Sequence, residues 1–232
     1  MRNHNEIHNS SGSNLKDIIL GGQDGLVNVL GVILGVAAAT YDTRIVIIAG
    51  LAATFAESIS MAAVAYTSTK AALGYYLSQL KKEEQEIQDI PKIEKREVYD
   101  IYYKKGFRGK LLNDIVKKII GNKKVWLQTM MAEELGLLPH EYSNPEKSAF
   151  VVGFSAVIGR IIPLMPFFFL PIKTSIIVAL VSAALTLFIT GIIKAKLTVG
   201  NKFKSGIEML IIGILAALSG YLVGILFSNV KF

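Results

Sequence analysis

Five long apolar stretches constrain this chain of 232 residues more than any other feature. Each approaches or exceeds the roughly 20 residues that an α-helix needs to cross ~30 Å of hydrocarbon. Because 52% of the residues are hydrophobic, a soluble protein of this length would expose far too much apolar surface. We therefore predict an all-α, five-span transmembrane bundle. The spans are expected at Asp17 to Thr40, Arg44 to Tyr66, Ser148 to Leu170, Thr174 to Ile193 and Gly206 to Phe227.

A highly charged segment of the chain, Lys81 to Pro145, separates the second span from the third. The region from Ile45 to Asp89 contains no proline, which predicts one helix that leaves the membrane and ends at the Asp89-Ile90-Pro91 turn. Glycines then divide the segment into three shorter helices, expected at Lys92 to Lys105, Lys110 to Ile120 and Lys123 to Leu135. The predicted organisation is a disordered tail (1–14), spans 1 and 2 (15–80), a helical insert (81–145) and spans 3 to 5 (146–232).

Basic residues indicate the orientation, since Lys and Arg accumulate in short cytoplasmic loops. Four lysines crowd the fourth connection: Lys194, Lys196, Lys202 and Lys204. The N-terminus and the insert are therefore expected in the cytoplasm. A cytoplasmic face set against anionic headgroups accounts for the formal net charge of +7 without nucleic-acid binding.

The polar segment from Met1 to Asn14 is not expected to be a cleavable signal peptide. The absence of cysteine excludes disulfides and thiolate sites.

Pairs of glutamates in the insert are spaced for metal binding. Two residues three apart share one helix face, and a turn at Pro91 brings two such faces together. Converging carboxylates repel one another until a divalent cation lies among them, and a thioether one turn from a carboxylate favours a transition metal. The alternative interpretation is an ordinary solvated surface, to which we assign Glu84 and Glu133. The candidate ligands are Glu83, Glu86, Glu94, Glu97, Met130 and Glu134.

Ionisable residues inside the spans are the second set of candidates, because each costs ~2.5 to 3.5 kcal/mol or more to insert. Asp24 lies in the first span, and Glu57 lies one turn from Met61 in the second. A carboxylate there would release a proton when metal binds, which is the physical basis of metal/proton antiport. For Asp24 a helix-capping role stays open. For Arg160, in the third span, a structural ion pair and a role in the ion pathway are equally supported.

Small residues recur at spacings that let helices approach closely: Gly21 and Gly25, Gly31 and Gly35, Gly220 and Gly224. They fit a tightly packed bundle and a homodimer equally well. Five helices would poorly enclose a pathway lined by Asp24, Glu57 and Met61, which favours a two-fold axis beside the first two spans.

The motifs together resemble the vacuolar iron transporter family over roughly Leu15 to Phe227. They are Asp24-Gly25-Leu26-Val27, Ser60-Met61, the Glu-x-x-Glu pairs, Glu133-Glu134-Leu135-Gly136-Leu137 and Pro163-Leu164-Met165-Pro166. The resemblance implies a homodimer of five-span subunits, without enzymatic activity, that moves Fe²⁺ and often Mn²⁺ out of the cytosol in exchange for protons. It also implies that the six insert residues bind metal and that Asp24 and Met61 line the pathway.

One departure from the family concerns a membrane glutamate, whose position corresponds here to Ala53. Glu57 lies one turn later on the same helix face and is the expected substitute. Because no organelle-targeting segment precedes the first span, we expect the cell membrane of a prokaryote.

Three hypotheses follow. The first is proton-coupled export of Fe²⁺, with Mn²⁺ and Zn²⁺ as further candidate ions and no cofactor. The second is a membrane-anchored metal-buffering or ferroxidase-like protein, although Glu-x-x-His ligand pairs are missing and the histidines are only His4, His8 and His140. The third is a scaffold without transport.

Overall fold

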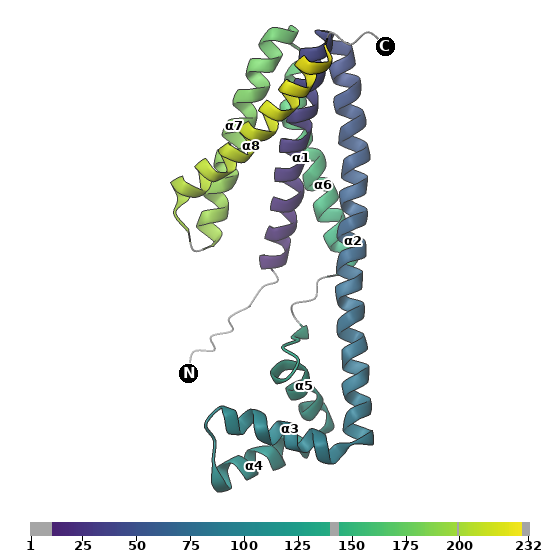
Figure 1. The fold of residues 1–232 in the computed structure, drawn as a ribbon, viewed down its shortest axis with the longest axis vertical. Helices are drawn as coiled ribbons and strands as arrows, with labels where there is room; N and C mark the ends of the chain where they lie inside the picture. Colours follow the sequence, from purple (N-terminus) through teal and green to yellow (C-terminus); the bar gives the residue numbers. More distant parts are fainter. Residues whose placement is uncertain (1–10, 140–143, 199, 229–232) are drawn as a thin grey trace, which may run out of the picture. The chain divides into compact units, whose positions relative to one another are not determined.

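The computed structural model describes residues 11–139, 144–198 and 200–228, and in this part of the chain the regular structure is entirely helical. Five helices are long and apolar enough to cross a membrane, which confirms the all-α, five-span prediction. The chain divides into two compact units (Figure 1). We call them the membrane unit (1–66 and 145–232) and the insert unit (67–144). Of the predicted tail, residues 1–10 lie outside the described part and 11–14 belong to the first helix.

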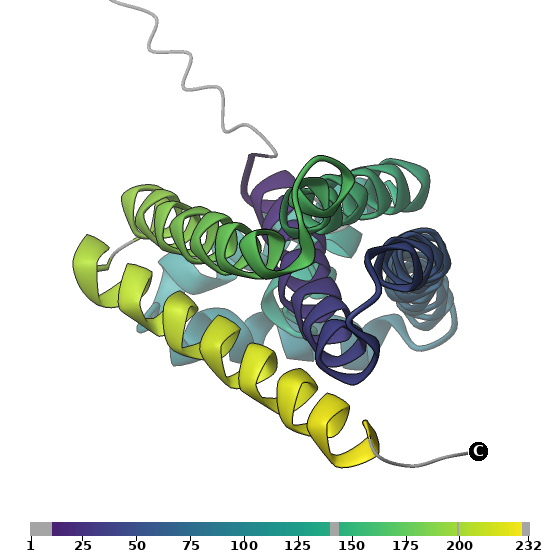
Figure 2. The same cartoon turned by 90° about the horizontal axis from the view of Figure 1, so that it is seen from above.

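Helix α1 (Ser11–Thr40) occupies the middle of the membrane unit. It packs against α6 (Pro145–Leu164), α7 (Ile172–Leu197) and α8 (Lys202–Phe227), as the view from above shows (Figure 2). Its buried face consists of aliphatic side chains, whereas the outer helices leave many large apolar side chains exposed. This distribution suits a bundle that is surrounded by lipid, because lipid tails are as apolar as the side chains that face them.

Glycines allow the close helix contacts of this unit. A Cβ atom at Gly25 would lie 2.5 Å from the carbonyl oxygen of Ala156, and one at Gly35 would lie 2.7 Å from that of Gly220. Gly224 likewise faces the backbone of Gly35. The small-residue pattern therefore serves packing of α1 against α6 and α8 within one subunit.

Helix α2 (Thr43–Asp89) follows α1 after a two-residue link. Tyr41 has a φ of 50°, and the side chain of Asp42 accepts a hydrogen bond from the backbone N–H of Arg44 at 2.8 Å. Asp42 thus caps the helix in the way expected of an aspartate. The uninterrupted helix predicted from Ile45 to Asp89 is present, and Pro91 begins the next one.

The third predicted span consists of α6 and a short 3-10 helix, η2 (Met165–Phe168). Pro163 lies inside α6, and Pro166 lies within η2. A proline inside a helix removes one backbone hydrogen bond and clashes with the preceding turn. Two prolines three residues apart therefore end the regular α-helix.

The insert unit contains α3 (Pro91–Lys104), α4 (Gly109–Ile120) and α5 (Lys123–Glu133). Gly106 and Gly109 have positive φ in the link between α3 and α4, and the side chain of Asn122 caps α5. The core of the unit is apolar and includes Val98, Leu112, Val116, Trp126 and Met130. Its boundary at Thr67 lies earlier in α2 than Lys81, where the charged segment begins.

Candidate functional site

Three carboxylates converge in the insert unit. Glu83 from α2, Glu94 from α3 and Glu134 at the end of α5 each offer an oxygen, and these oxygens all lie within 4.8 Å of one another. Glu83 and Glu94 are only 3% exposed. One oxygen of each, Glu83 Oε1 and Glu94 Oε2, is buried without a hydrogen-bond partner. Buried anionic oxygens without a donor are costly, so this group is chemically suited to a cation.

The electrostatics of this cluster favour its protonated form when no cation is bound. Burial raises the pKa of Glu83 to about 8, with further contributions from a hydrogen bond with Glu94 and from the charges of Glu94, Glu134 and Glu86. Burial also raises the pKa of Glu134, to which Glu97, Glu94 and Glu86 add while Lys82 acts in the opposite direction. Like charges in one site oppose ionisation, and a divalent cation would reverse the effect.

The other predicted ligands of the insert lie around this group. Burial raises the pKa of Glu97, and the charges of Glu94, Glu86 and Asp100 raise it further. Glu86 is about one third exposed and pairs with Lys82 at 3.5 Å. Met130 is fully buried in the apolar core of the unit. The structure therefore brings carboxylate oxygens of Glu83, Glu94 and Glu134 within 4.8 Å of one another. Glu86 and Glu97 are acidic neighbours of this group.

Two glutamates that the sequence assigned to the surface form surface ion pairs. Glu84 pairs with Lys123 at 2.9 Å, and Glu133 pairs with Lys105 at 2.5 Å. All four side chains are between about one third and one half exposed. Neighbours in sequence thus differ in surroundings, since Glu83 and Glu134 face other carboxylates whereas Glu84 and Glu133 face lysines.

The predicted ligands of the membrane unit meet at Arg160, which is fully buried on α6. Its Nη2 atom lies 3.0 Å from Oε2 of Glu57, 3.5 Å from Oδ2 of Asp24 and 3.7 Å from the sulfur of Met61. Its Nε atom lies 3.3 Å from the same oxygen of Glu57. Three helices, α1, α2 and α6, position these groups.

Ser58 is a member of this site that the sequence analysis did not identify. Its hydroxyl oxygen accepts a hydrogen bond from Nη1 of Arg160 at 3.1 Å and is buried. The sequence places this serine directly after Glu57, but its role in the site becomes apparent only from its contact with Arg160. The carboxylates themselves are less covered, because the side chain of Asp24 is 47% exposed and that of Glu57 is 34% exposed in the single subunit.

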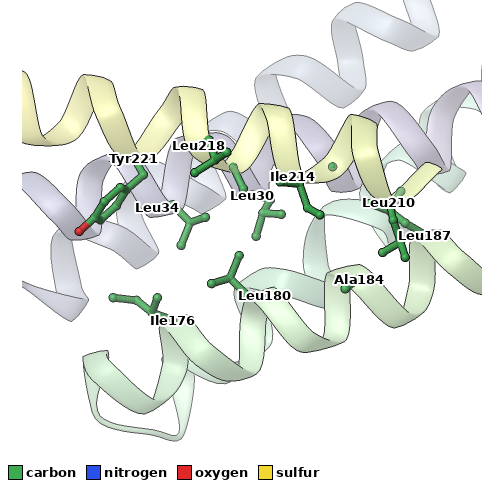
Figure 3. Close-up of a pocket in the computed structure, with 12 residues that line it drawn as sticks. Leu30, Leu34, Ile176, Leu180, Ala184, Leu187, Leu210, Ile214, Leu218 and Tyr221 are labelled. Atoms are coloured by element: carbon green, nitrogen blue, oxygen red, sulfur yellow. The ribbon is translucent and has the colours of Figure 1, made fainter. Parts of the chain in front are cut away.

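The apolar cavity of the membrane unit is a different feature. It has a volume of about 370 Å³ and lies between α1, α7 and α8, where Leu30, Leu180 and Ile214 point into it (Figure 3). Its lining includes no charged side chain among the described residues, and the Tyr221 hydroxyl is its polar group. A hydrocarbon-lined cavity cannot replace the hydration shell of an ion, so we place no ion chemistry there.

The VIT family model matches residues 15–225. The chain is 32% identical over 222 residues to vacuolar iron transporter 1 of Tulipa gesneriana, and the alignment covers 95% of this chain and 90% of that protein. It is 33% identical over 236 residues to the vacuolar iron transporter of Plasmodium falciparum (isolate 3D7), covering 97% and 86%. It is 32% identical over 219 residues to vacuolar iron transporter 1 of Arabidopsis thaliana, covering 94% and 88%.

Proposed function

Because the chain belongs to the VIT family, we propose that it is a proton-coupled transporter that exports Fe²⁺ from the cytosol, with Mn²⁺ as a second substrate. Family membership confirms the resemblance inferred from the motifs and the expectation that the chain is a membrane transporter and not an enzyme. Proton coupling, the second substrate and the direction of transport are proposed from the chemistry of the two sites.

One observation supports metal handling most strongly: the convergence of Glu83, Glu94 and Glu134 with unpartnered buried oxygens. Carboxylate oxygens suit divalent ions generally, and the thioether of Met130, four residues before Glu134, adds a soft donor that favours Fe²⁺ over Mg²⁺. We propose that this cluster, with Glu86, Glu97 and Met130 completing it, captures the ion on the cytoplasmic side.

Asp24, Glu57 and Met61 are proposed to carry the ion through the membrane. The repeated combination of carboxylates and a thioether supports this assignment, since the same ligand types occur in both units. A divalent ion and protons compete for the same carboxylate oxygens, so binding of one favours release of the other. Alternation of metal and protons at the same groups is the basis of the proposed antiport.

We propose further that two subunits form a homodimer around the membrane site. The partial exposure of Asp24 and Glu57 in one subunit supports this, because carboxylates at membrane depth face a bundle interior or water and not lipid.

The matched relatives carry the name of the vacuole, and nothing in the comparisons supports the prokaryotic cell membrane expected from the sequence. We therefore propose a multi-pass membrane location.

The test is flux in proteoliposomes that hold the purified chain, with anaerobic Fe²⁺ on one side and an imposed proton gradient. We expect Fe²⁺ movement coupled to proton counterflow, and at least a tenfold loss of rate in Asp24→Asn and in Met61→Leu. Glu208→Gln is the matched control, because Glu208 lies on α8 near Lys194 at 3.8 Å, and its rate should stay within twofold of the unchanged protein. No flux by the unchanged protein, or full flux in both pathway variants, would contradict the proposal.

A further inference from the structure

A single nitrogen atom occupies the point on which the predicted membrane ligands converge. Arg160 Nη2 is within 3.0 to 3.7 Å of one atom from each of Glu57, Asp24 and Met61. Nothing in the spacing of these residues along the chain requires an arginine to join them, since Arg160 lies about a hundred positions beyond Glu57. The guanidinium is therefore placed by the fold at the centre of the candidate ion site.

The rest of the guanidinium is held firmly. Nε also contacts Glu57, and Nη1 donates to the buried hydroxyl of Ser58. Arg160 is 0% exposed, so its positive charge depends on these partners for compensation. An isolated buried charge is very costly, and two carboxylates with a hydroxyl supply the acceptors that make this one tolerable.

The same groups cannot serve a metal ion and the guanidinium at once. Carboxylate oxygens and sulfur bind first-row metal ions at about 2.0 to 2.3 Å, so a bound ion would lie in the space that Nη2 fills. Two cations at one point would also repel each other strongly in a site of low dielectric constant. Occupation by one therefore requires that the other leave.

We propose that Arg160 is a tethered competitor of the transported ion: its guanidinium fills the membrane site when no metal is bound, and the divalent cation must displace it. This inference rests on the proposed transport function and deepens it. Arg160 then limits the affinity of the site, so that a captured ion can leave again.

The test compares ion affinity in full-length protein whose insert site has been removed by Glu83→Ala and Glu134→Ala. Mn²⁺ binding to the remaining site is measured by calorimetry at one pH. We expect Arg160→Gln to bind Mn²⁺ at least tenfold more tightly than this background and to transport more slowly, because nothing displaces the ion. A role limited to packing predicts the opposite sign, namely weaker binding. Equal or weaker binding by folded Arg160→Gln would overturn the proposal.

Two further variants keep the test decisive. Arg44→Gln removes a basic residue from the exposed start of α2, and it should leave the affinity within twofold. If Arg160→Gln does not fold, Arg160→Lys is the test variant. Its single ammonium group keeps the positive charge but cannot contact all the partners of the guanidinium at once, so it should compete less well with the ion. We expect Arg160→Lys to bind Mn²⁺ about threefold more tightly, and an unchanged or weaker affinity would overturn the proposal.

Flux and affinity measurements separate the transport function from the competitor role of Arg160. If the unchanged chain shows no flux, the proposed function is wrong whatever the affinities are. If it transports metal while neither Arg160 variant binds Mn²⁺ more tightly, the transport function stands and only the competitor role of Arg160 is wrong.

Discussion

The two carboxylate clusters of this chain differ in how their negative charge is balanced. In the membrane unit, Asp24 and Glu57 share the buried guanidinium of Arg160. In the insert unit, Glu83 and Glu94 form no ion pair with a lysine or arginine among the described residues, and each has a buried oxygen without a donor. One cluster carries its own counter-charge, and the other depends on protons or on an external cation.

The counter-charge suits a site among membrane-spanning helices, because a bare pair of ionised carboxylates is costly to insert in hydrocarbon. The insert cluster lies in a unit that also carries many lysines, of which Lys123 and Lys105 pair with the outer glutamates Glu84 and Glu133. Protonation lowers the cost of leaving the inner carboxylates unpaired. The comparison predicts strong, pH-sensitive capture in one unit and weaker, exchangeable binding in the other.

The largest expected effect concerns the insert cluster. Glu83→Gln should weaken Mn²⁺ binding to the insert unit about a hundredfold or more, because it removes the charge of one of the two buried glutamate ligands. Calorimetry on full-length protein measures the change, and Glu84→Gln is the matched control because that side chain is exposed and paired with Lys123. Equal losses in the two variants would mean that the neighbouring charges, and not a defined site, attract the ion.

The thioether gives the next effect. Met130→Leu conserves volume at a fully buried position, so the free energy of unfolding should change by less than about 1.5 kcal/mol. Affinity for Fe²⁺ should fall about tenfold while that for Mg²⁺ stays the same, because only the softer ion gains from sulfur. Competition of the two ions in one titration measures this selectivity. A parallel loss for both ions would assign Met130 to the core alone.

The pH dependence of stability separates the two clusters directly. The pKa of Glu83 is raised from 4.5 to about 8 in the folded chain, so the folded state holds a proton that the unfolded state releases. The resulting stabilisation is complete below about pH 4.5 and is lost as the pH rises through about 8. Without metal, the melting temperature of the insert unit should therefore fall by several degrees between pH 5 and pH 9.

Saturating Mn²⁺ should reverse this fall, and its stabilisation should be greater at pH 8 than at pH 5, where protons compete for the carboxylates. Glu83→Gln should flatten the profile. A melting temperature that rises with pH in metal-free protein would show that Glu83 is ionised in the folded state.

The smallest effect is expected at the outer ion pairs. Glu133→Gln removes the partner of Lys105 from a surface where both side chains are at least one third exposed. Such pairs contribute roughly 0 to 1 kcal/mol, so the melting temperature should change by a few degrees at most. Mn²⁺ affinity should stay within threefold, and a larger loss would place Glu133 among the ligands.

Much of the architecture was predictable because local patterns determine it. The described helices agree with three local features of the sequence: the length of the apolar spans, the proline-free run of α2, and the glycines after α3 and α4. The Glu-x-x-Glu spacing likewise placed candidate ligands on common faces, although only the fold shows which of them reach one another. Glu86 is an example, since it shares a face with Glu83 but pairs with Lys82.

The surroundings of Arg160 were beyond such reasoning. The sequence left an ion pair and a pathway role equally open, and the structure shows that one side chain contacts Asp24, Glu57, Ser58 and Met61 together. That convergence depends on the close crossing of α1 and α6, where Gly159 lies directly against the backbone of Gly22. Contacts across a hundred residues depend on how helices cross, which spacing within a helix does not specify.

Pro163 has a mechanical consequence for α6. Because proline has no N–H, the carbonyl group of Gly159 lacks its usual helical donor, one residue before Arg160. The turn of α6 that carries Arg160 is therefore held by one backbone hydrogen bond fewer than a regular helical turn. A bend of α6 would cost least there, and Arg160 is the charged side chain that such a bend would move.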